Sequence, residues 1–347
     1  MQAIDFIATN RRADLFQRDP SFVYRCDNLA RTLGSQGWQT RTKHLKSLSV
    51  RDSGQTVVFH RPGTSPRLSW LTWRLRKRGV RLIADFDDLV FDPDYVQYSP
   101  AILNGVLPLH KMERAFSASR RALDLFDVIT VSTQPLLEHV RRLVPGKQVF
   151  VLPNAVHHSW LDEALPPADN FDGKTITYFP GTRSHDRDFR MIAPVIERFL
   201  DQYPDTRLQI TGHLNQAIQA RQGQVTQTPR VPFGDYINHL RTGWVNLAPL
   251  EVTPFNHCKS ALKVLEAGYW GIPSISSPNP DFERFANAGA MLASTEEQWF
   301  DALVKLRDRE FYKTHTARLR ERVLELADPG SRAEQFIKET LTDTSKQ

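Results

Sequence analysis

Hydrophobic and polar positions alternate along the first half of the chain in blocks that predict strands and helices in turn. Short apolar runs predict strands at 4–9, 56–60, 80–87, 128–133 and 149–155. Between them, apolar residues recur at helical spacing and predict helices at 22–38, 68–79 and 108–126. Repeated strand–helix–strand order is typical of a parallel sheet with helices on both faces.

The same alternation starts again after residue 155. It predicts strands at 175–181, 207–212, 244–250 and 273–277, with helices at 189–203, 234–242, 259–270 and onward to about 338. We therefore predict an α/β fold with two Rossmann-like lobes, whose ligands bind in the cleft at the carboxyl ends of the strands. The predicted units are an N-terminal lobe at 1–155, a C-terminal lobe at 156–325, and a helix and tail at 326–347.

The composition is that of a globular protein. The chain has 347 residues, of which 40% are hydrophobic and 24% charged, so disorder, collagen and coiled coil are excluded. No apolar run approaches the roughly 18 residues of a membrane span, and the N-terminus lacks a signal-peptide core. Cys26 and Cys258 are too few for a disulfide framework or a zinc site, so we expect a cytoplasmic location.

Charge is distributed unequally between the two predicted lobes. Residues 1–155 hold 23 Lys and Arg against 14 Asp and Glu, whereas the remainder holds 22 against 25. A basic lobe beside a slightly acidic one predicts that the first lobe meets an anionic partner. Nucleic acid, a phospholipid surface and a phosphorylated acceptor all carry such charge, so charge alone does not choose among them.

The segment PFNHCKSALKVLEAGYWGIPSISSP at 254–278 contains the first candidate site. With a helix start near Cys258, the residues Lys259, Lys263 and Glu266 lie along one stripe. Two lysines near a helix N-terminus attract an anion, and a carboxylate two turns further suits the hydroxyls of a ribose. The segment therefore predicts a nucleotide-sugar site, although a solvated Lys/Glu helix face has the same spacing.

The segment YFPGTRSHDRDF at 178–189 contains the second candidate site. Its predicted strand ends at Gly181, and the loop that follows carries Thr182, Arg183, His185 and Arg187. Glycine lets the backbone approach a ligand closely, and an arginine here could clamp a phosphate. The alternative is a capped strand-to-helix turn with solvated charges.

Together these segments resemble the C-terminal lobe of GT-B glycosyltransferases, specifically the retaining family-4-like group (glycosyltransferase group 1). The resemblance covers nearly the whole chain in element order and residues 150–280 in motif detail, with LEAGYWGIP as its most specific part. It implies that Glu266 binds the ribose of a nucleotide-sugar donor. It also implies that Arg183 contacts the donor phosphate.

One position departs from the family pattern. The family often has a Glu eight positions before the ribose-binding one, and Cys258 stands there in this chain. The variant N-x-C-K-S-x-x-K-x-x-E resembles a subset of bacterial polysaccharide glycosyltransferases and implies that other residues contact phosphate and sugar. The predicted donor-binding set is Gly181, Thr182, Arg183, His185, Asn256, Lys259, Lys263 and Glu266.

A cluster of carboxylates ends a predicted strand of the first lobe. Asp85, Asp87 and Asp88 could be a D-x-D metal motif of a GT-A enzyme, but the two-lobe order does not fit that class, so we expect no metal or cofactor. The resemblance places Asp87 where related enzymes have a cleft-facing His. There it would orient or deprotonate the acceptor hydroxyl, or stabilise an oxocarbenium-like transition state, unless it only caps the next turn or pairs with arginines. His60, after another strand, is a further cleft candidate beside Asp85 and Asp88.

The helix at 67–79 is basic and carries two tryptophans. Trp70 and Trp73 lie among Arg67, Arg74 and neighbouring cations, a pattern that suits peripheral contact with an anionic membrane. The alternative is an ordinary surface helix that packs its leucines inward.

The resemblance implies a metal-independent glycosyltransferase that moves a sugar from a nucleotide sugar to a glycan or lipid-linked acceptor in bacterial cell-envelope polysaccharide synthesis, with retention. Asp87 is the expected catalytic residue, and the inner face of the cytoplasmic membrane is the expected place of action. A nucleotide-sugar epimerase or phosphorylase on the same fold is a second hypothesis. A nucleic-acid-binding or scaffold protein is a third, which is disfavoured because aromatic and basic residues do not alternate on a strand face.

Overall fold

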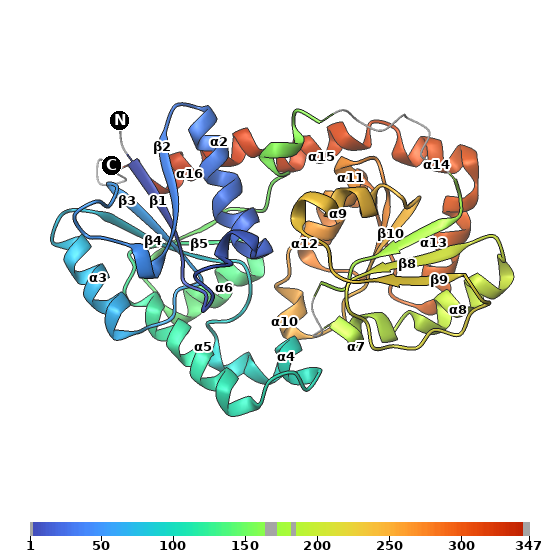
Figure 1. The fold of residues 1–347 in the computed structure, drawn as a ribbon, viewed down its shortest axis with the longest axis horizontal. Helices are drawn as coiled ribbons and strands as arrows, with labels where there is room; N and C mark the ends of the chain where they lie inside the picture. Colours follow the sequence, from blue (N-terminus) through green and yellow to red (C-terminus); the bar gives the residue numbers. More distant parts are fainter. Residues whose placement is uncertain (1–2, 164–171, 182–184, 343–347) are drawn as a thin grey trace.

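The computed structural model describes residues 3–163, 172–181 and 185–342, which form two α/β lobes side by side (Figure 1). Each lobe is built on a six-stranded sheet in which all neighbouring strands are parallel. Helices cover both faces of each sheet. The predicted α/β fold of two Rossmann-like lobes is confirmed.

The first sheet has the strand order β2-β1-β3-β4-β5-β6. Its strands are β1 (Ala3–Ala8), β2 (Gln39–His44), β3 (Thr56–His60), β4 (Arg81–Phe86), β5 (Val128–Val131) and β6 (Gln148–Val151). The apolar residues of the inner strands are buried on both faces of the sheet. One apolar cluster packs under α3 (Pro66–Arg76), α5 (Leu109–Leu123) and α6 (Gln134–Leu143), and another packs under α2 (Asn28–Ser35) on the opposite face.

Shorter helical segments of the first lobe contact the second lobe. The predicted helix at 22–38 is three consecutive pieces: α1 (Pro20–Phe22), a π turn η2 (Val23–Asp27) and α2. A second group follows β4 and consists of a 3-10 helix, η4 (Pro93–Tyr98), and α4 (Pro100–Leu103).

The second sheet has the order β12-β11-β10-β7-β8-β9. Its strands are β7 (Thr175–Tyr178), β8 (Arg207–Thr211), β9 (Val225–Thr228), β10 (Val245–Ala248), β11 (Ser274–Ser276) and β12 (Ala290–Leu292). The helices around it are α7 (Asp186–Arg190), α8 (Ala193–Gln202), α9 (Phe233–Leu240), α10 (Pro254–His257), α11 (Leu262–Tyr269), α12 (Pro280–Glu283), α13 (Glu296–Arg307), α14 (Arg309–Thr316) and α15 (Leu319–Ala327). One apolar cluster lies under α8 and α13, and another lies under α9, α11 and α15.

Three strands were absent from the sequence prediction, and each lies at a sheet edge. They are β2, β9 and β12. An edge strand is only partly buried, so its sequence carries little of the apolar signal that marks a central strand. The sequence QTRTKH of β2 is polar at almost every position, and only His44 is buried.

The last helix, α16 (Pro329–Thr340), returns to the first lobe and packs beside α2 (Figure 1). Its Ala333 and Phe336 belong to the same apolar cluster as β1, and the ring of Phe336 lies 6.2 Å from that of Phe6. The end of the chain therefore ties the second lobe back to the first. The strands of the two sheets lie within residues 3–151 and 175–292, and the finer boundaries at 155 and 325 stay predictions.

Candidate functional site

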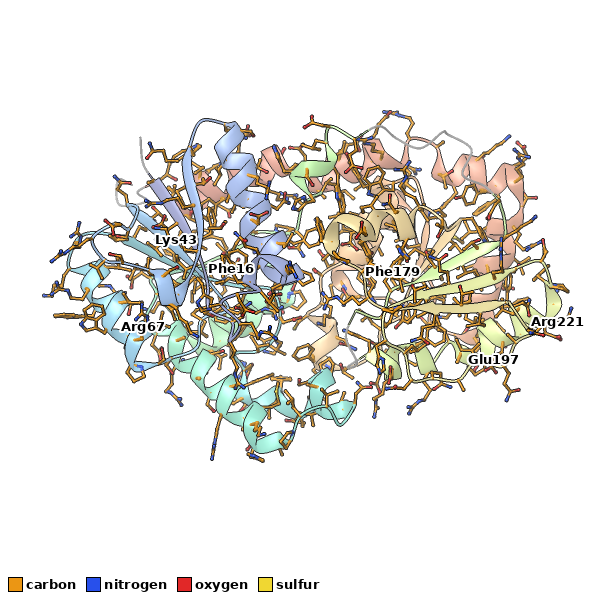
Figure 2. The ribbon with its side chains drawn as sticks, viewed as in Figure 1. Phe16, Lys43, Arg67, Phe179, Glu197 and Arg221 are labelled. Carbon is orange, nitrogen blue, oxygen red and sulfur yellow. The ribbon has the colours of Figure 1, made fainter. Side chains whose placement is uncertain are left out.

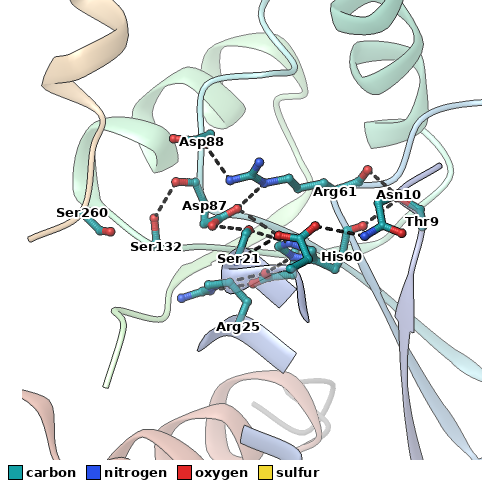
Figure 3. Close-up of polar contacts among 12 residues, drawn as sticks. Thr9, Asn10, Ser21, Arg25, His60, Arg61, Asp87, Asp88, Ser132 and Ser260 are labelled. Atoms are coloured by element: carbon teal, nitrogen blue, oxygen red, sulfur yellow. Dashed lines mark hydrogen bonds and ion pairs between the residues drawn. The ribbon is translucent and has the colours of Figure 1, made fainter. Parts of the chain in front are cut away.

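The first half of the site lies at the carboxyl ends of two neighbouring strands, β3 and β4. In the parallel register His60 pairs with Asp85, so the residues that follow each strand emerge side by side. Figure 3 shows the polar side chains gathered there. The three carboxylates of the predicted cluster each meet a cation instead of converging on one point.

Asp85 is the innermost of the three and is buried. Its oxygens accept from Arg25 Nη2 at 2.6 Å and Thr130 Oγ1 at 2.7 Å, and Oδ2 lies 3.2 Å from His60 Nδ1. Burial by itself raises the pKa of Asp85, but the charge of Arg25 and the hydrogen bonds lower it below its usual value. Asp85 therefore anchors the cluster from beneath, and His60 is buried with it.

Asp87 lies one layer further out, with its side chain 12% exposed. Ser21 Oγ donates to its Oδ2 at 2.5 Å, and Arg61 Nε donates to its Oδ1. Burial raises the pKa of Asp87, yet the charges of Arg61 and His60 outweigh it and hold the pKa well below its usual range. A carboxylate held so firmly in the ionised form is a weak proton acceptor, so this environment favours orientation or electrostatic stabilisation over general-base catalysis.

Ser21 also connects Asp87 to the buried histidine. Its Oγ lies 2.7 Å from His60 Nε2, so Asp85, His60, Ser21 and Asp87 form one continuous chain of hydrogen bonds. This chain fixes the orientation of Asp87 from below.

Arg61 holds the two outer carboxylates together. It has a left-handed backbone, φ 45°, which is uncommon for a residue with a side chain. The Thr9 hydroxyl donates to the carbonyls of His60 and Arg61 and helps to hold this turn. The guanidinium of Arg61 contacts both Asp87 and Asp88, and its Nη2 donates to Asp88 Oδ2 at 2.7 Å.

Asp88 links the two lobes. Its Oδ1 accepts from Lys259 Nζ at 2.7 Å, and Lys259 belongs to the predicted donor-binding set of the second lobe. The ion pair brings together the carboxyl ends of β4 and of β10 in the opposite sheet. Side chains from both lobes fill the space between the sheets (Figure 2).

The prediction of one helix starting near Cys258 is wrong. The segment contains two helices, and Cys258–Ala261 connects the end of α10 to the start of α11. Lys259 therefore does not share a helical stripe with Lys263 and Glu266, and it turns to the first lobe instead. Phe255 and Cys258 pack into the apolar cluster of the first lobe, and this docking pulls the segment away from a continuous helix.

Lys263, in the first turn of α11, carries a buried ammonium group. Its Nζ has no hydrogen-bond partner within the described parts of the chain, and it lies 5.3 Å from the ring centre of Tyr178. Burial lowers its pKa to about 8, against the opposing charges of Asp188 and Glu266. A buried cation without a hydrogen-bonding partner is costly, and an anionic ligand would relieve that cost.

Glu266 lies one turn further along α11 and is buried. Tyr24 Oη donates to its Oε1, and Tyr236 Oη donates to its Oε2 at 2.7 Å. Burial raises its pKa to about 7, although both hydroxyl donors act in the opposite direction. Tyr24 comes from the π turn of the first lobe, so Glu266 is a second point of contact between the lobes.

A third group surrounds Asp188 at the start of α7. Its carboxylate accepts from the backbone N of Glu251 at 2.8 Å and from Asn256 Nδ2 at 3.2 Å, and it lies 2.7 Å from His185 Nδ1. Burial lowers the pKa of His185, and the charges of Lys263 and Lys259 act in the same direction. His185 and Asn256 are thus fixed in place beside Lys263.

The structure describes three candidates of the predicted glycine loop, namely Gly181, His185 and Arg187. Gly181 follows β7 with φ 77°, a conformation that glycine adopts without strain. Thr182 and Arg183 lie outside the described residues. Arg187 is engaged by Glu251, to which its Nε donates at 2.9 Å, so in this structure it is paired rather than open to a phosphate.

Several residues of the site had no sequence signal. Tyr24 and Arg25 lie on the helical segment that was predicted at 22–38 only by its apolar spacing, and Ser21 lies just before it in α1. Tyr236 lies on α9. Each reaches the site through contacts with residues 30 to 242 positions away in the chain. Arg61 is next to His60, but its unusual backbone cannot be inferred from its neighbours.

Metal coordination was one hypothesis for the acidic cluster. Within residues 3–163, 172–181 and 185–342, no group of three or more His, Cys, Asp and Glu is arranged to hold a metal ion. The same residues contain no helix long and apolar enough to cross a bilayer.

A scan against protein-family models finds no match for the chain, and a search of curated proteins finds none either. Solved structures do match. A protein assigned as a UDP-N-acetylglucosamine 2-epimerase from Listeria monocytogenes matches with TM-score 0.58 and 12% identity over 96% of this chain and 94% of that one. The glycosyltransferase of kitacinnamycin matches with TM-score 0.52 and 13% identity over 98% and 99%.

A variant of TarM from S. aureus, in complex with fondaparinux, α-GlcNAc-glycerol and UDP, also matches. The TM-score is 0.59 and the identity 11%, over 86% of this chain and 57% of TarM. The present chain therefore spans little more than half the length of TarM. At such identities the likeness shows a shared fold, and that fold is the two-lobed GT-B fold.

Proposed function

We propose that this protein is a glycosyltransferase that binds a nucleotide-sugar donor on its second lobe and transfers the sugar to a glycan or lipid-linked acceptor on its first. The observation that carries the proposal is the pair Lys263 and Glu266 on α11. One is a buried ammonium without a hydrogen-bond partner among the described residues, and the other is a buried carboxylate one turn away. A diphosphate with an adjoining ribose supplies the anion that Lys263 lacks and hydroxyls that can take the place of the Tyr24 hydroxyl on Glu266.

The first lobe occupies part of the same site in the ligand-free protein. The carboxylate of Asp88 forms an ion pair with Lys259, and the hydroxyl of Tyr24 donates a hydrogen bond to Glu266. These are the same chemical groups, an anion and a hydroxyl, that a donor would bring. We infer that the donor displaces both and that the lobes separate slightly to admit it.

In the proposed reaction the cations of the second lobe stabilise the negative charge that develops on the leaving phosphate. Asp87 faces the cleft as a fixed negative charge, which suits the positive charge that develops on the sugar ring. Retention, independence from a metal, and action in bacterial cell-envelope polysaccharide synthesis are parts of the proposal that rest on the family resemblance. Closure of the cleft would exclude water, which otherwise hydrolyses the donor.

A nucleotide-sugar epimerase is the second candidate. It is favoured by the match to the L. monocytogenes protein, which covers nearly the full length of both chains. An epimerase converts the donor without an acceptor and leaves the sugar attached to the nucleotide. Analysis of the products by mass spectrometry and NMR distinguishes an isomerised donor from a free nucleotide with a new glycosidic bond.

The first test is a thermal-shift screen of nucleotides and their common sugar conjugates, with and without EDTA. A ligand at about 100 times its Kd stabilises the folded state by about 2.7 kcal/mol, a shift that is easily measured. We expect one nucleotide to stabilise the wild type and to stabilise Glu266→Gln markedly less. The absence of a shift with every nucleotide would contradict the proposed function.

We expect the affinity for the nucleotide-sugar donor to have a maximum between pH 7 and pH 8. Below about pH 7 Glu266 becomes protonated and loses its capacity to accept from two ribose hydroxyls, and above about pH 8 Lys263 loses its charge. Affinity should therefore fall up to tenfold per pH unit on either side. Titration calorimetry should show that Glu266→Gln removes the acid limb and keeps the alkaline one. An unchanged acid limb would mean that another group controls it.

We expect Asp88→Asn to bind the donor up to about five times more tightly than the wild type. The substitution removes the anion that competes for Lys259, and a partly exposed ion pair contributes up to about 1 kcal/mol. Lys259→Ala provides the opposite comparison, because it removes the cation itself and should weaken binding. Weaker binding by Asp88→Asn would show that Asp88 supports the donor site instead of competing with the donor.

A further inference from the structure

Helix α3 of the first lobe exposes two tryptophans on its outer face. Trp70 is 54% exposed and Trp73 is 52% exposed, whereas the other five tryptophans of the chain are buried or partly buried. The inward face of the helix is already satisfied, because Leu68, Leu71 and Leu75 are buried in the core. About half of the surface of each indole therefore lies outside the packing of the lobe.

Cations share this outer face. Trp70, Trp73, Arg74 and Lys77 follow the i, i+3, i+4, i+7 spacing of one helical stripe. The guanidinium of Arg74 lies 6.0 Å and 5.9 Å from the ring centres of the two indoles. Arg78 extends the stripe beyond the last turn.

Acidic residues are missing from the same region. The sequence contains no Asp or Glu between Asp52 and Asp85. Arg76 pairs with Asp127, but Arg74, Lys77 and Arg78 form no ion pair with any carboxylate in the described part of the chain. The surface is therefore both apolar and strongly cationic, and its charge is not neutralised by the protein.

We propose that α3 docks the first lobe onto an anionic phospholipid bilayer. In this arrangement Trp70 and Trp73 lie at the level of the headgroups, and Arg74, Lys77 and Arg78 contact the lipid phosphates. Indoles favour this interface because each combines a large apolar ring with one N–H donor. The helix lies on the bilayer and does not cross it.

The position of the helix favours a bilayer over a nucleic acid. Helix α3 lies at the outer side of the first lobe, away from the second lobe (Figure 1), and its Arg67 is labelled there in Figure 2. A single-stranded nucleic acid is usually bound in a basic groove with stacking platforms along its length. Two neighbouring exposed indoles on an outward-facing helix instead suit the interface of a bilayer.

The docking would act independently of the donor site and extends the proposed function. It would keep the acceptor lobe at the surface where a lipid-linked glycan is found. Because α3 shares no residue with the cleft, the binding of lipid and of nucleotide can be measured separately.

The test is co-sedimentation of the full chain with vesicles. We expect binding to phosphatidylcholine vesicles that contain 30% phosphatidylglycerol, little binding to pure phosphatidylcholine, and weaker binding at high salt, since each cation near an anionic surface strengthens binding by about fivefold. Trp70→Ser/Trp73→Ser should weaken binding at least tenfold. Arg74→Gln/Lys77→Gln/Arg78→Gln should weaken it further.

A matched control removes the same charge from the second lobe. The triple variant Lys174→Gln/Arg221→Gln/Lys313→Gln should bind vesicles like the wild type. Lipids brominated on their acyl chains should quench part of the tryptophan fluorescence of the wild type and not that of the double tryptophan variant. Unchanged melting temperatures would show that every variant is folded.

Three results would overturn the proposal. These are vesicle binding that does not depend on the two tryptophans, no binding to anionic vesicles at low salt, and tighter binding to an oligonucleotide than to the vesicles. The nucleotide thermal shift of Trp70→Ser/Trp73→Ser should match that of the wild type. A missing nucleotide shift in both proteins would contradict the proposed function and leave the membrane result standing.

Discussion

Lys263→Met is expected to stabilise the ligand-free protein and to abolish its binding of nucleotides. The ammonium of Lys263 is buried without a hydrogen-bond partner among the described residues, and its pKa is lowered to about 8. Methionine fills a similar volume without the charge. The free energy of unfolding should rise by about 1–3 kcal/mol, a range kept low because the stem of the side chain is partly exposed. This gain corresponds to a few degrees in melting temperature.

The loss of binding should be large, because the donor phosphates would lose their buried cation. Truncating one partner of a buried charged pair typically weakens binding by roughly 30- to 1,000-fold. Calorimetry with the nucleotide found in the thermal-shift screen measures this effect, and a melting curve without ligand measures the stability. A stable ligand-free protein that no longer binds is the pattern expected of a binding residue, which natural proteins keep at the expense of stability.

Lys259→Met is the matched control for Lys263→Met. Lys259 already has a partner in Asp88. Its replacement leaves a partly buried carboxylate that, among the described residues, pairs only with Arg61. It should weaken donor binding without stabilising the protein. If Lys263→Met instead lowered the melting temperature and bound nucleotide normally, Lys263 would be a structural residue.

Asp87→Asn is expected to lower the turnover number about 10²- to 10⁴-fold while leaving donor affinity nearly unchanged. The substitution keeps the shape of the side chain and removes its fixed negative charge. Arg61 keeps Asp88 as its partner, so the protein should remain folded, with a loss of roughly 1–3 kcal/mol in stability. The slow hydrolysis of the donor provides an assay before the acceptor is identified.

Asp92→Asn separates catalysis from stability. Asp92 is a buried carboxylate of the same lobe, but its partners are His139 and Arg142. We expect its replacement to cost a similar amount of stability without lowering the turnover number. Equal turnover in the two variants would mean that Asp87 has only a structural role.

The low pKa of Asp87 leads us to expect no pH dependence of turnover from its own ionisation between pH 5 and pH 9.

The central strands of both sheets could be predicted from the sequence because they are buried on two faces. Runs such as TVVFH in β3 and VITV in β5 are buried along their whole length, so their apolar residues alone identify them as strands. The edge strands carry no such mark, because β2 and β9 are largely polar and β12 is only three residues long. Their pairing depends on a neighbouring strand that is already in place, and this is a property of the assembled sheet.

The candidate donor site was predictable only in part. The sequence places Lys263 and Glu266 three residues apart on one helix, and the structure keeps them on α11. Their perturbed pKa values come from burial, which depends on elements far away in the chain, including the π turn that carries Tyr24. Local spacing contains no information on such burial.

By itself, the sequence determined the repeated α/β pattern, the basic first lobe and the chemical types of the residues that end the inner strands. These follow from local periodicity and composition, which act over a few residues. Only the tertiary structure decided that the helix breaks after α10, that Lys259 meets Asp88 across the lobes, and that α16 returns to the first lobe. These features depend on packing between segments up to about 330 residues apart, because the free energy of each contact exists only once both lobes have formed.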